Sequence, residues 1–210
     1  MILSNTKDMT INSDCQDLIT DPACFNAGLV KQNPNPPERE DLKLNIFQAI
    51  TPNHIFKVQA LLRSFVEWLR IRYRESEWFV DGYFDKQAFE AELGSLPGMY
   101  APPKGRLYLA KYDGISAGCA ALRNLGNHTC EMKRLFVSAD YHGKRIGRNL
   151  AGALIKDAKA IGYSRMLLDT GYKQVEAQRL YRSLGFSEIK PYYTIPQEVK
   201  DRLIFMELVL

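Results

Sequence analysis

The stretch that decides the fold runs from Glu131 to Gly147 and reads Glu-Met-Lys-Arg-Leu-Phe-Val-Ser-Ala-Asp-Tyr-His-Gly-Lys-Arg-Ile-Gly. Its apolar part, Leu135-Phe136-Val137, predicts a strand, and the amphipathic pattern after Gly147 predicts a helix. The loop between them is basic and contains glycine. The free N–H groups and the dipole of a helix N-terminus attract an anion, and glycine lets the backbone approach it. We therefore expect this loop to bind a pyrophosphate.

Two familiar phosphate loops do not fit, because the spacings of a Walker A loop and of a Gly-x-Gly-x-x-Gly fingerprint are absent. The loop resembles instead the Gln/Arg-x-x-Gly-x-Gly/Ala loop of the GNAT superfamily, the acetyl-CoA-dependent N-acetyltransferases. His142 stands at the Gln/Arg position, Arg145 at the first glycine and Gly147 at the last. On its residues alone, a basic turn before an ordinary helix is the alternative. The resemblance implies that acetyl-CoA is held by Leu135, Phe136, Val137, His142, Gly143, Lys144, Arg145, Ile146, Gly147 and Arg148.

A second motif follows in residues 176–186, which read Glu-Ala-Gln-Arg-Leu-Tyr-Arg-Ser-Leu-Gly-Phe. Its apolar residues recur at helical spacing, and Gly185 is a natural residue to end a helix. The segment resembles the Ala-x-x-Leu-Tyr-x-x-Leu-Gly-Phe helix of the same superfamily. This resemblance implies that the Tyr181 hydroxyl protonates the departing CoA thiolate. An aromatic ring packed on the core face of the helix is the alternative. Lys173 and Gln174 stand where relatives often carry an asparagine that contacts the cofactor, so that contact is unassigned.

The rest of the chain reads as strands and helices. Asp113-Gly114 predicts a hairpin turn, and Thr51-Pro52 is a good N-cap and first-turn pair for a helix. A second helix is predicted over residues 85–93, and further strands at 42–50, 106–112, 115–123, 164–170 and 203–210. The resemblance implies the GNAT type of α/β fold. Its mixed, mostly antiparallel central sheet has about seven strands with a splayed parallel pair, flanked by about four helices.

Composition limits the function without choosing it. With 46% hydrophobic residues, a chain of 210 residues can bury one sizeable core. Residues 42–210 are expected to form one N-acetyltransferase domain. Residues 1–41 lack periodicity and end in a proline-rich stretch, so we expect a poorly ordered arm and linker.

Charge and hydropathy exclude several classes of partner. A net charge of +4 does not resemble the basic stripe of a nucleic-acid binder. No apolar run approaches the roughly 18 residues of a membrane span, and the start lacks a signal-peptide pattern. We expect a cytoplasmic protein without a nucleic-acid or membrane partner. The oligomeric state is not set by the sequence, and a homodimer is among the options.

The four cysteines show no zinc or redox spacing. Cys119 and Cys130 lie on neighbouring predicted strands, where small core residues are a better interpretation than a disulfide. His54 and His128 have no metal-ligand partner at sensible spacing, so no metal is expected.

Glu131 is the candidate base. An aliphatic amine with a pKa near that of lysine, about 10.4, is mostly protonated at neutral pH, and a carboxylate can take its proton directly or through water. The spacing of Glu131 from Gly147 resembles that of the base glutamate in the histone-acetylating branch. A solvent-facing or salt-bridged strand residue is the alternative.

The strand after Glu131 has main-chain roles in the superfamily. By resemblance, a backbone N–H near Leu135 faces the thioester oxygen as an oxyanion donor, and Val137 pairs with the pantetheine amides. Unless a β-bulge intervenes, alternation puts both residues on the side of Glu131 and Lys133. Two ordinary core strand residues are the compatible alternative.

The acceptor site is the least defined part. In relatives it lies between the first two helices and the C-terminal hairpin, which here supply Trp78, Tyr83 and Tyr192. Carboxylates near these aromatics could hold a cationic amine, and a solvated face is the alternative. The leading hypothesis for the whole chain is an enzyme that acetylates a primary amine of a small molecule or peptide by direct transfer in a ternary complex. The alternatives are a non-catalytic acyl-CoA-binding module and a small basic nucleic-acid binder.

Overall fold

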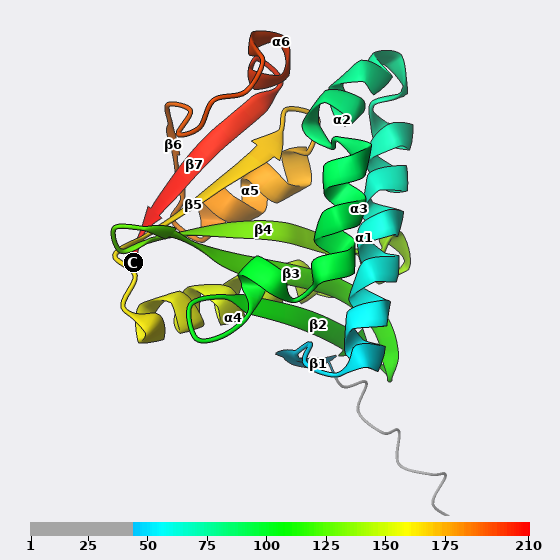
Figure 1. Cartoon of the computed structure of the whole chain (residues 1–210), viewed down its shortest axis with the longest axis vertical. Coiled ribbons are helices and arrows are strands. Elements are labelled where there is room, and N and C mark those ends of the chain that lie inside the picture. The colour runs from blue at the N-terminus through cyan, green and yellow to red at the C-terminus, as the bar shows by residue number, and fades with distance from the viewer. Residues whose placement is uncertain (1–43) are drawn as a thin grey trace, which may run out of the picture. The chain divides into compact units, whose positions relative to one another are not determined.

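The computed structural model describes residues 44–210, so the arm and linker predicted for residues 1–41 lie outside the described residues. Seven strands form one sheet in the order β1-β2-β3-β4-β5-β7-β6 (Figure 1). Neighbouring strands are antiparallel except for the parallel pair β4 and β5, so the predicted fold class is confirmed. The strands are β1 (Leu44–Gln48), β2 (Arg106–Tyr112), β3 (Ile115–Gly126), β4 (Thr129–Val137), β5 (Arg165–Gly171), β6 (Ser187–Ile189) and β7 (Leu203–Val209).

Helices cover both faces of this sheet. An apolar cluster joins the first three helices to one face, and a second cluster joins α4 and α5 to the other. The described residues hold six helices where about four were expected, because the short helices α2 and α6 carry too few turns for a clear periodic pattern. The helices are α1 (Pro52–Arg72), α2 (Glu77–Tyr83), α3 (Lys86–Ser95), α4 (Ile146–Ile161), α5 (Val175–Ser183) and α6 (Gln197–Lys200).

Local signals in the sequence set several element boundaries. The Thr51 side chain caps α1 by accepting a hydrogen bond from the His54 N–H, 3.2 Å away, and Pro52 occupies the first turn. Asp113 and Gly114 both have positive φ, 51° and 77°, in the two-residue turn between β2 and β3. Such a turn matches the twist of the two strands that it joins. Both predictions are confirmed.

A β-bulge interrupts β4. Cys119 pairs with Phe136 and Ala121 with Lys133, so β4 has one extra residue between these pairs, and Arg134 has a left-handed φ of 58°. The extra residue reverses the alternation of the strand. Lys133 therefore reaches Tyr83 of α2, whereas Leu135 and Val137 pack with the cluster around α4. The bulge is the exception to the alternation expected from the sequence, and Leu135 and Val137 therefore do not share the side of Glu131 and Lys133.

Strands β4 and β5 diverge soon after they meet. Their pairing extends from Thr129 with Arg165 to Glu131 with Leu167. Beyond that point the strands separate, which leaves the later part of β4 open on that edge and positions the site described below.

Two further findings concern the core and the helices. Cys119 and Cys130 are free and buried in clusters on opposite faces of the sheet, as predicted for small core residues. Within residues 44–210, the helices are too short or too polar for any of them to cross a bilayer.

Candidate active site

The predicted anion loop leads directly into α4. Arg145 is the N-cap residue, with φ 59°, and its side chain makes no capping hydrogen bond. Gly143 has φ 80°, and the His142 ring nitrogen Nε2 lies 3.0 Å from the Val137 carbonyl oxygen. Two residues of the loop, Gly143 and Arg145, thus have a left-handed backbone conformation. No side chain caps the N–H groups of the first turn of α4, so they can face an anion.

A groove of about 640 Å³ runs beside this loop. All the residues predicted to hold acetyl-CoA line it except Lys144, whose ammonium lies 4.5 Å from the centre of the Tyr112 ring. Lys144 therefore stands on the outer side of the loop. The predicted residues that line the groove are Leu135, Phe136, Val137, His142, Gly143, Arg145, Ile146, Gly147 and Arg148.

Two helices complete the groove with residues that the sequence did not assign to it. Arg72 of α1 pairs with Glu176 of α5 at 2.6 Å and lies 4.8 Å from the centre of the Trp68 ring. This group joins α1 to α5 at the groove. The sequence motif in α5 could have identified Ala177 and Leu180 as groove residues, whereas no motif in α1 identifies Phe65, Trp68 or Arg72. The added lining residues are Phe65, Trp68, Arg72, Ala139, Tyr141, Gln174, Glu176, Ala177 and Leu180.

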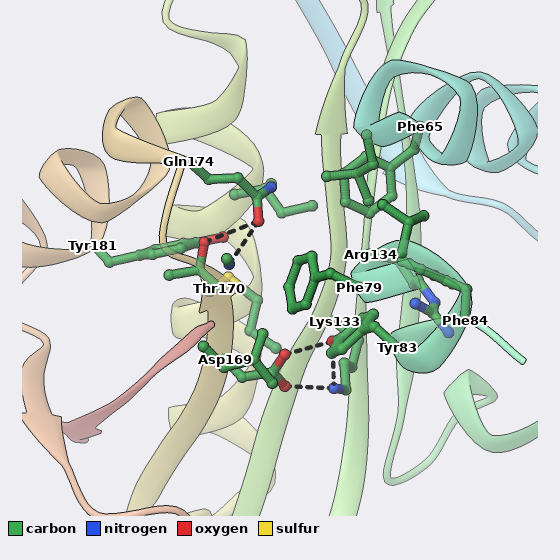
Figure 2. Close-up of a pocket in the computed structure, with 16 residues that line it drawn as sticks. Phe65, Phe79, Tyr83, Phe84, Lys133, Arg134, Asp169, Thr170, Gln174 and Tyr181 are labelled. Carbon is green, nitrogen blue, oxygen red and sulfur yellow. Dashed lines mark hydrogen bonds and ion pairs between the residues drawn. The ribbon is translucent and has the colours of Figure 1, made fainter. Parts of the chain in front are cut away.

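A second, smaller cavity of about 50 Å³ lies where β4 and β5 diverge. It extends from the aromatic side chains of α1 and α2 to Asp169 on β5 and Tyr181 on α5 (Figure 2). Phe65, Leu135 and Gln174 line both this cavity and the groove. The two spaces therefore meet at these three residues, next to the bulge in β4.

Tyr181 reaches from α5 into the small cavity (Figure 2). Only 6% of its surface is exposed. Burial raises the pKa of its hydroxyl, the negative charge of Asp169 raises it further, and Lys133 opposes the shift only in part. The hydroxyl therefore keeps its proton at neutral pH. This state suits a proton donor.

Lys133, Asp169 and Tyr83 form a largely buried cluster in the same cavity (Figure 2). The Lys133 ammonium donates to the Asp169 carboxylate at 2.6 Å, and the Tyr83 hydroxyl donates to its other oxygen. Burial alone would lower the pKa of Lys133, but Asp169 and Glu131 outweigh it and raise that pKa to about 12. Burial opposes ionisation of Asp169, yet Lys133 holds the pKa of this carboxyl below its usual range. The pair is therefore charged at neutral pH.

Glu131, the predicted base, is completely buried. Its carboxylate accepts a hydrogen bond from Arg123 on one oxygen and from the Tyr192 hydroxyl, at 2.6 Å, on the other. The Lys133 ammonium lies 3.2 Å from that second oxygen. Glu131 lines neither the groove nor the small cavity. A proton would thus reach it through Tyr192 or Lys133.

The three predicted acceptor residues are only partly brought together. Tyr83 lines the small cavity, and Tyr192 contacts Glu131. Trp78 is 46% exposed and lies outside the cavity lining, with the Arg202 guanidinium 5.9 Å from its ring centre. The carboxylates expected beside these aromatics are on the surface, where Asp81 pairs with Arg70 at 2.7 Å and Glu75 lies 3.5 Å from Lys173. They do not face the small cavity.

Metal ligands are not grouped in this part of the chain. Across residues 44–210, no three histidine, cysteine, aspartate or glutamate side chains come together as an ion would require.

A mixed sheet that splits at one parallel pair, with a helix N-terminus beside the split, is the architecture of an N-acetyltransferase. Residues 62–186 match the acetyltransferase (GNAT) family, and the chain belongs to that family. An uncharacterized N-acetyltransferase of Schizosaccharomyces pombe is 38% identical over 121 residues, which cover 56% of this chain and 74% of the relative. The chain is therefore an acyltransferase.

Two further likenesses bear on the site. Mouse N-acetylaspartate synthetase is 28% identical over 144 residues, which cover 65% of this chain and 48% of that protein. The PaiA N-acetyltransferase of Thermoplasma acidophilum, solved in complex with coenzyme A, has a TM-score of 0.63 at 17% identity over 80% of this chain and 100% of its own. The second likeness is one of fold.

Proposed function

We propose that this enzyme transfers the acetyl group of acetyl-CoA directly to the primary amine of a small molecule while both substrates are bound. One observation carries the proposal. The groove and the small cavity are separate spaces that meet at Phe65, Leu135 and Gln174. A donor in the groove and an acceptor in the cavity would meet there, so no acetyl-enzyme intermediate is needed.

The groove suits the donor by its charge and shape. Uncapped N–H groups of α4 lie beside Arg145, Arg148 and His142, a set that complements a pyrophosphate. Leu135 to Val137 line the same groove on the edge of β4 that β5 has left. Main-chain groups on such an edge can pair with an amide-containing chain. The coenzyme A bound by the Thermoplasma protein of like fold supports this assignment.

Bound acetyl-CoA would supply an activated thioester. The backbone N–H of Leu135, at the junction of the two spaces, is our candidate donor to the thioester oxygen. A donor fixed in advance stabilises the negative charge that develops on that oxygen. The bulge at Arg134 supports this role, because it leaves Leu135 without a partner in the register of β3 and β4.

Tyr181 is our candidate general acid. Its hydroxyl is protonated at neutral pH because burial disfavours the tyrosinate. The hydroxyl proton would pass to the sulfur atom as negative charge develops there, while the acceptor amine loses its own proton. General acids of this kind typically contribute about 10²–10⁴-fold to a rate.

The base remains a prediction at Glu131. Because this carboxylate is enclosed, a proton from the amine would have to pass through Tyr192 or Lys133. The same contacts allow a second role, in which Glu131 only positions Arg123 and Lys133. The two roles predict a different dependence of the rate on pH.

A small-molecule acceptor is favoured over a peptide. The cavity that receives the amine is narrow and bordered by aromatic side chains of α1 and α2. The mouse relative, named for the synthesis of N-acetylaspartate, supports a small acceptor as well.

The test is a turnover assay with the purified full chain. Release of free CoA from acetyl-CoA is followed with a panel of amino acids, amines, polyamines and short peptides, and mass spectrometry identifies the product. We expect a product that is heavier than the acceptor by one acetyl group and carries it on nitrogen. The proposal would be overturned if none of the acceptors raises the rate of CoA release above the rate without an acceptor.

A further inference from the structure

A third cavity opens on the acceptor side of the site. It encloses about 210 Å³ and is lined by Tyr83, Arg123, Lys133, Arg134, Tyr193 and Ile195. Tyr83, Lys133 and Arg134 also line the small cavity, so the two spaces are contiguous. The lining of the third cavity holds three basic side chains and no carboxylate. A concave site with this composition favours an anionic group.

The carboxylates that pair with these cations lie behind the lining. Glu92 holds Arg134 through two hydrogen bonds, and Asp169 and Glu131 both contact Lys133. The donors of Lys133 are therefore used, since its third contact is the Tyr83 hydroxyl at 3.2 Å. Within the described part of the chain, Arg134 keeps its Nη1 group free, but its side chain is only 12% exposed and that of Lys133 only 14%.

Arg123 differs from the other two cations. Its Nε donates to Glu131, while Nη1 has only the Met99 sulfur at 3.6 Å, a weak acceptor. The outer edge of the guanidinium is thus available for a carboxylate, and its side chain is 33% exposed. Tyr193 adds a hydroxyl that has no hydrogen-bond partner among residues 44–210 and lines the same cavity.

We propose that the acceptor is an amino acid, whose carboxylate binds in the third cavity to the Nη groups of Arg123 and the hydroxyl of Tyr193. This inference rests on the proposed function and names its class of substrate. The amine would then extend past Lys133 into the small cavity, toward Leu135 and the groove. Arg123 and Tyr193 are therefore specificity residues. They recognise the acceptor without taking part in proton transfer.

The charges of the two spaces match the two ends of an amino acid. The amine would lie in the small cavity with the ionised Asp169, whereas the third cavity is lined by basic and uncharged side chains. The carboxylate of the same molecule compensates for the positive surroundings. A cationic polyamine carries no such group and would be repelled from this cavity.

The experiment compares matched acceptors in steady-state kinetics. Each amino acid is tested against its own carboxamide, which keeps the amine and the side chain but loses the negative charge. We expect kcat/KM to be about 10- to 100-fold higher for the acid, mainly through KM, the range expected for a hydrogen-bonded charge. The preference is diagnostic because the amine of the carboxamide is less basic, so a larger fraction of it is unprotonated near neutral pH and, without recognition of the carboxylate, the carboxamide would not be disfavoured on that account.

Two variants locate the effect. Arg123→Met should abolish the preference for the acid, and Arg123→Lys should restore part of it, because lysine keeps the charge but not the fork of donors. Tyr193→Phe removes one hydroxyl without disturbing Glu131 and should reduce the preference about 3- to 10-fold. The matched control is Arg63→Met, which loses an exposed pair with Glu90 and should leave the preference unchanged.

The outcomes separate this inference from the proposed function. Equal use of acids and carboxamides, or a preference for polyamines, would overturn the amino-acid acceptor while acetyl transfer stands. An acid preference that survives in both Arg123→Met and Tyr193→Phe would also overturn it. If none of the amines tested is acetylated, both the proposed function and this inference are contradicted.

Discussion

At the scale of single residues, the site depends on side chains whose surroundings fix their protonation. Tyr181 lies in a cavity that also holds Asp169 and Lys133, and its pKa is raised by burial. Asp169 and Lys133 stay ionised because each stabilises the other. The surroundings thus leave Tyr181 neutral beside a fixed ion pair. That difference between neighbours is typical of catalytic sites.

Changing Tyr181 to phenylalanine tests the proton donor. The ring and its packing stay, but the hydroxyl is lost, so kcat should fall by about 10–10⁴-fold while CoA affinity changes little. Because burial raises the pKa of Tyr181, its titration should not limit the wild-type rate between pH 6 and 9, about the range in which amines gain reactivity. The measurement is kcat across that range, with CoA affinity from calorimetry.

The matched control is Tyr163→Phe, which removes a hydroxyl that donates to the Lys104 carbonyl at 2.7 Å. It should keep its activity. Full activity in Tyr181→Phe would remove the acid role.

Changing Glu131 to glutamine separates a base from a positioning residue. If Glu131 accepts the amine proton, the rate should fall most at low pH, where the amine is protonated, and should recover in part as pH rises. If it only holds Arg123 and Lys133, the loss should be the same at every pH. A pH–rate profile for wild type and Glu131→Gln distinguishes the two, with Asp157→Asn, a carboxylate paired with Arg106, as control.

At the scale of elements, the sequence predicted what is local and missed what is assembled from distant segments. The loop before α4 and the α5 motif are continuous stretches, so the loop could be assigned to the groove and Tyr181 to catalysis in advance. Arg72 meets Glu176 across 104 positions of the chain, and no local pattern marks such a contact. The position of the bulge at Arg134 could not be predicted for a related reason, because it depends on the register of β4 with β3 and not on a sequence motif.

The acceptor side was the hardest part to predict. The acidic residues near Trp78 suggested a site for a cationic amine, but in the fold they pair with surface cations. The cations Arg123, Lys133 and Arg134 come from two adjacent strands and line the third cavity together. The pairing of β3 with β4 brings these three cations together, and the identities of single residues in the sequence do not reveal that pairing.

Replacing Gly147 by aspartate tests the anion site at the start of α4. A Cβ atom there would meet only Leu180 and Val137, at 3.6 and 3.7 Å, so the backbone tolerates a side chain. The added carboxylate would oppose a bound pyrophosphate, and CoA affinity should fall by at least about tenfold. Calorimetric titration with CoA measures the effect.

The matched control is Gly152→Asp, in the same helix, where a Cβ atom would meet nothing within 4 Å. This variant has the same change of charge away from the groove lining. It should bind CoA like wild type. Equal CoA affinity in Gly147→Asp and Gly152→Asp would contradict the proposed anion site.

At the scale of the whole molecule, one sheet holds three contiguous spaces around its split. Residues 44–210 form all seven strands and the groove. We therefore propose that the N-acetyltransferase domain comprises residues 42–210, and that a chain lacking residues 1–41 keeps its melting temperature within a few degrees and its CoA affinity within about twofold. Thermal unfolding and calorimetry of the shortened chain measure both. A large drop in melting temperature would show that the removed residues contribute to the domain.

The central claim is that donor and acceptor are bound together, in spaces that meet at Leu135. Initial rates measured while both acetyl-CoA and the acceptor are varied test it most directly. We predict double-reciprocal lines that intersect, with no acetylated enzyme seen by mass spectrometry after incubation with acetyl-CoA alone. Parallel lines together with an enzyme that gains one acetyl group would contradict direct transfer.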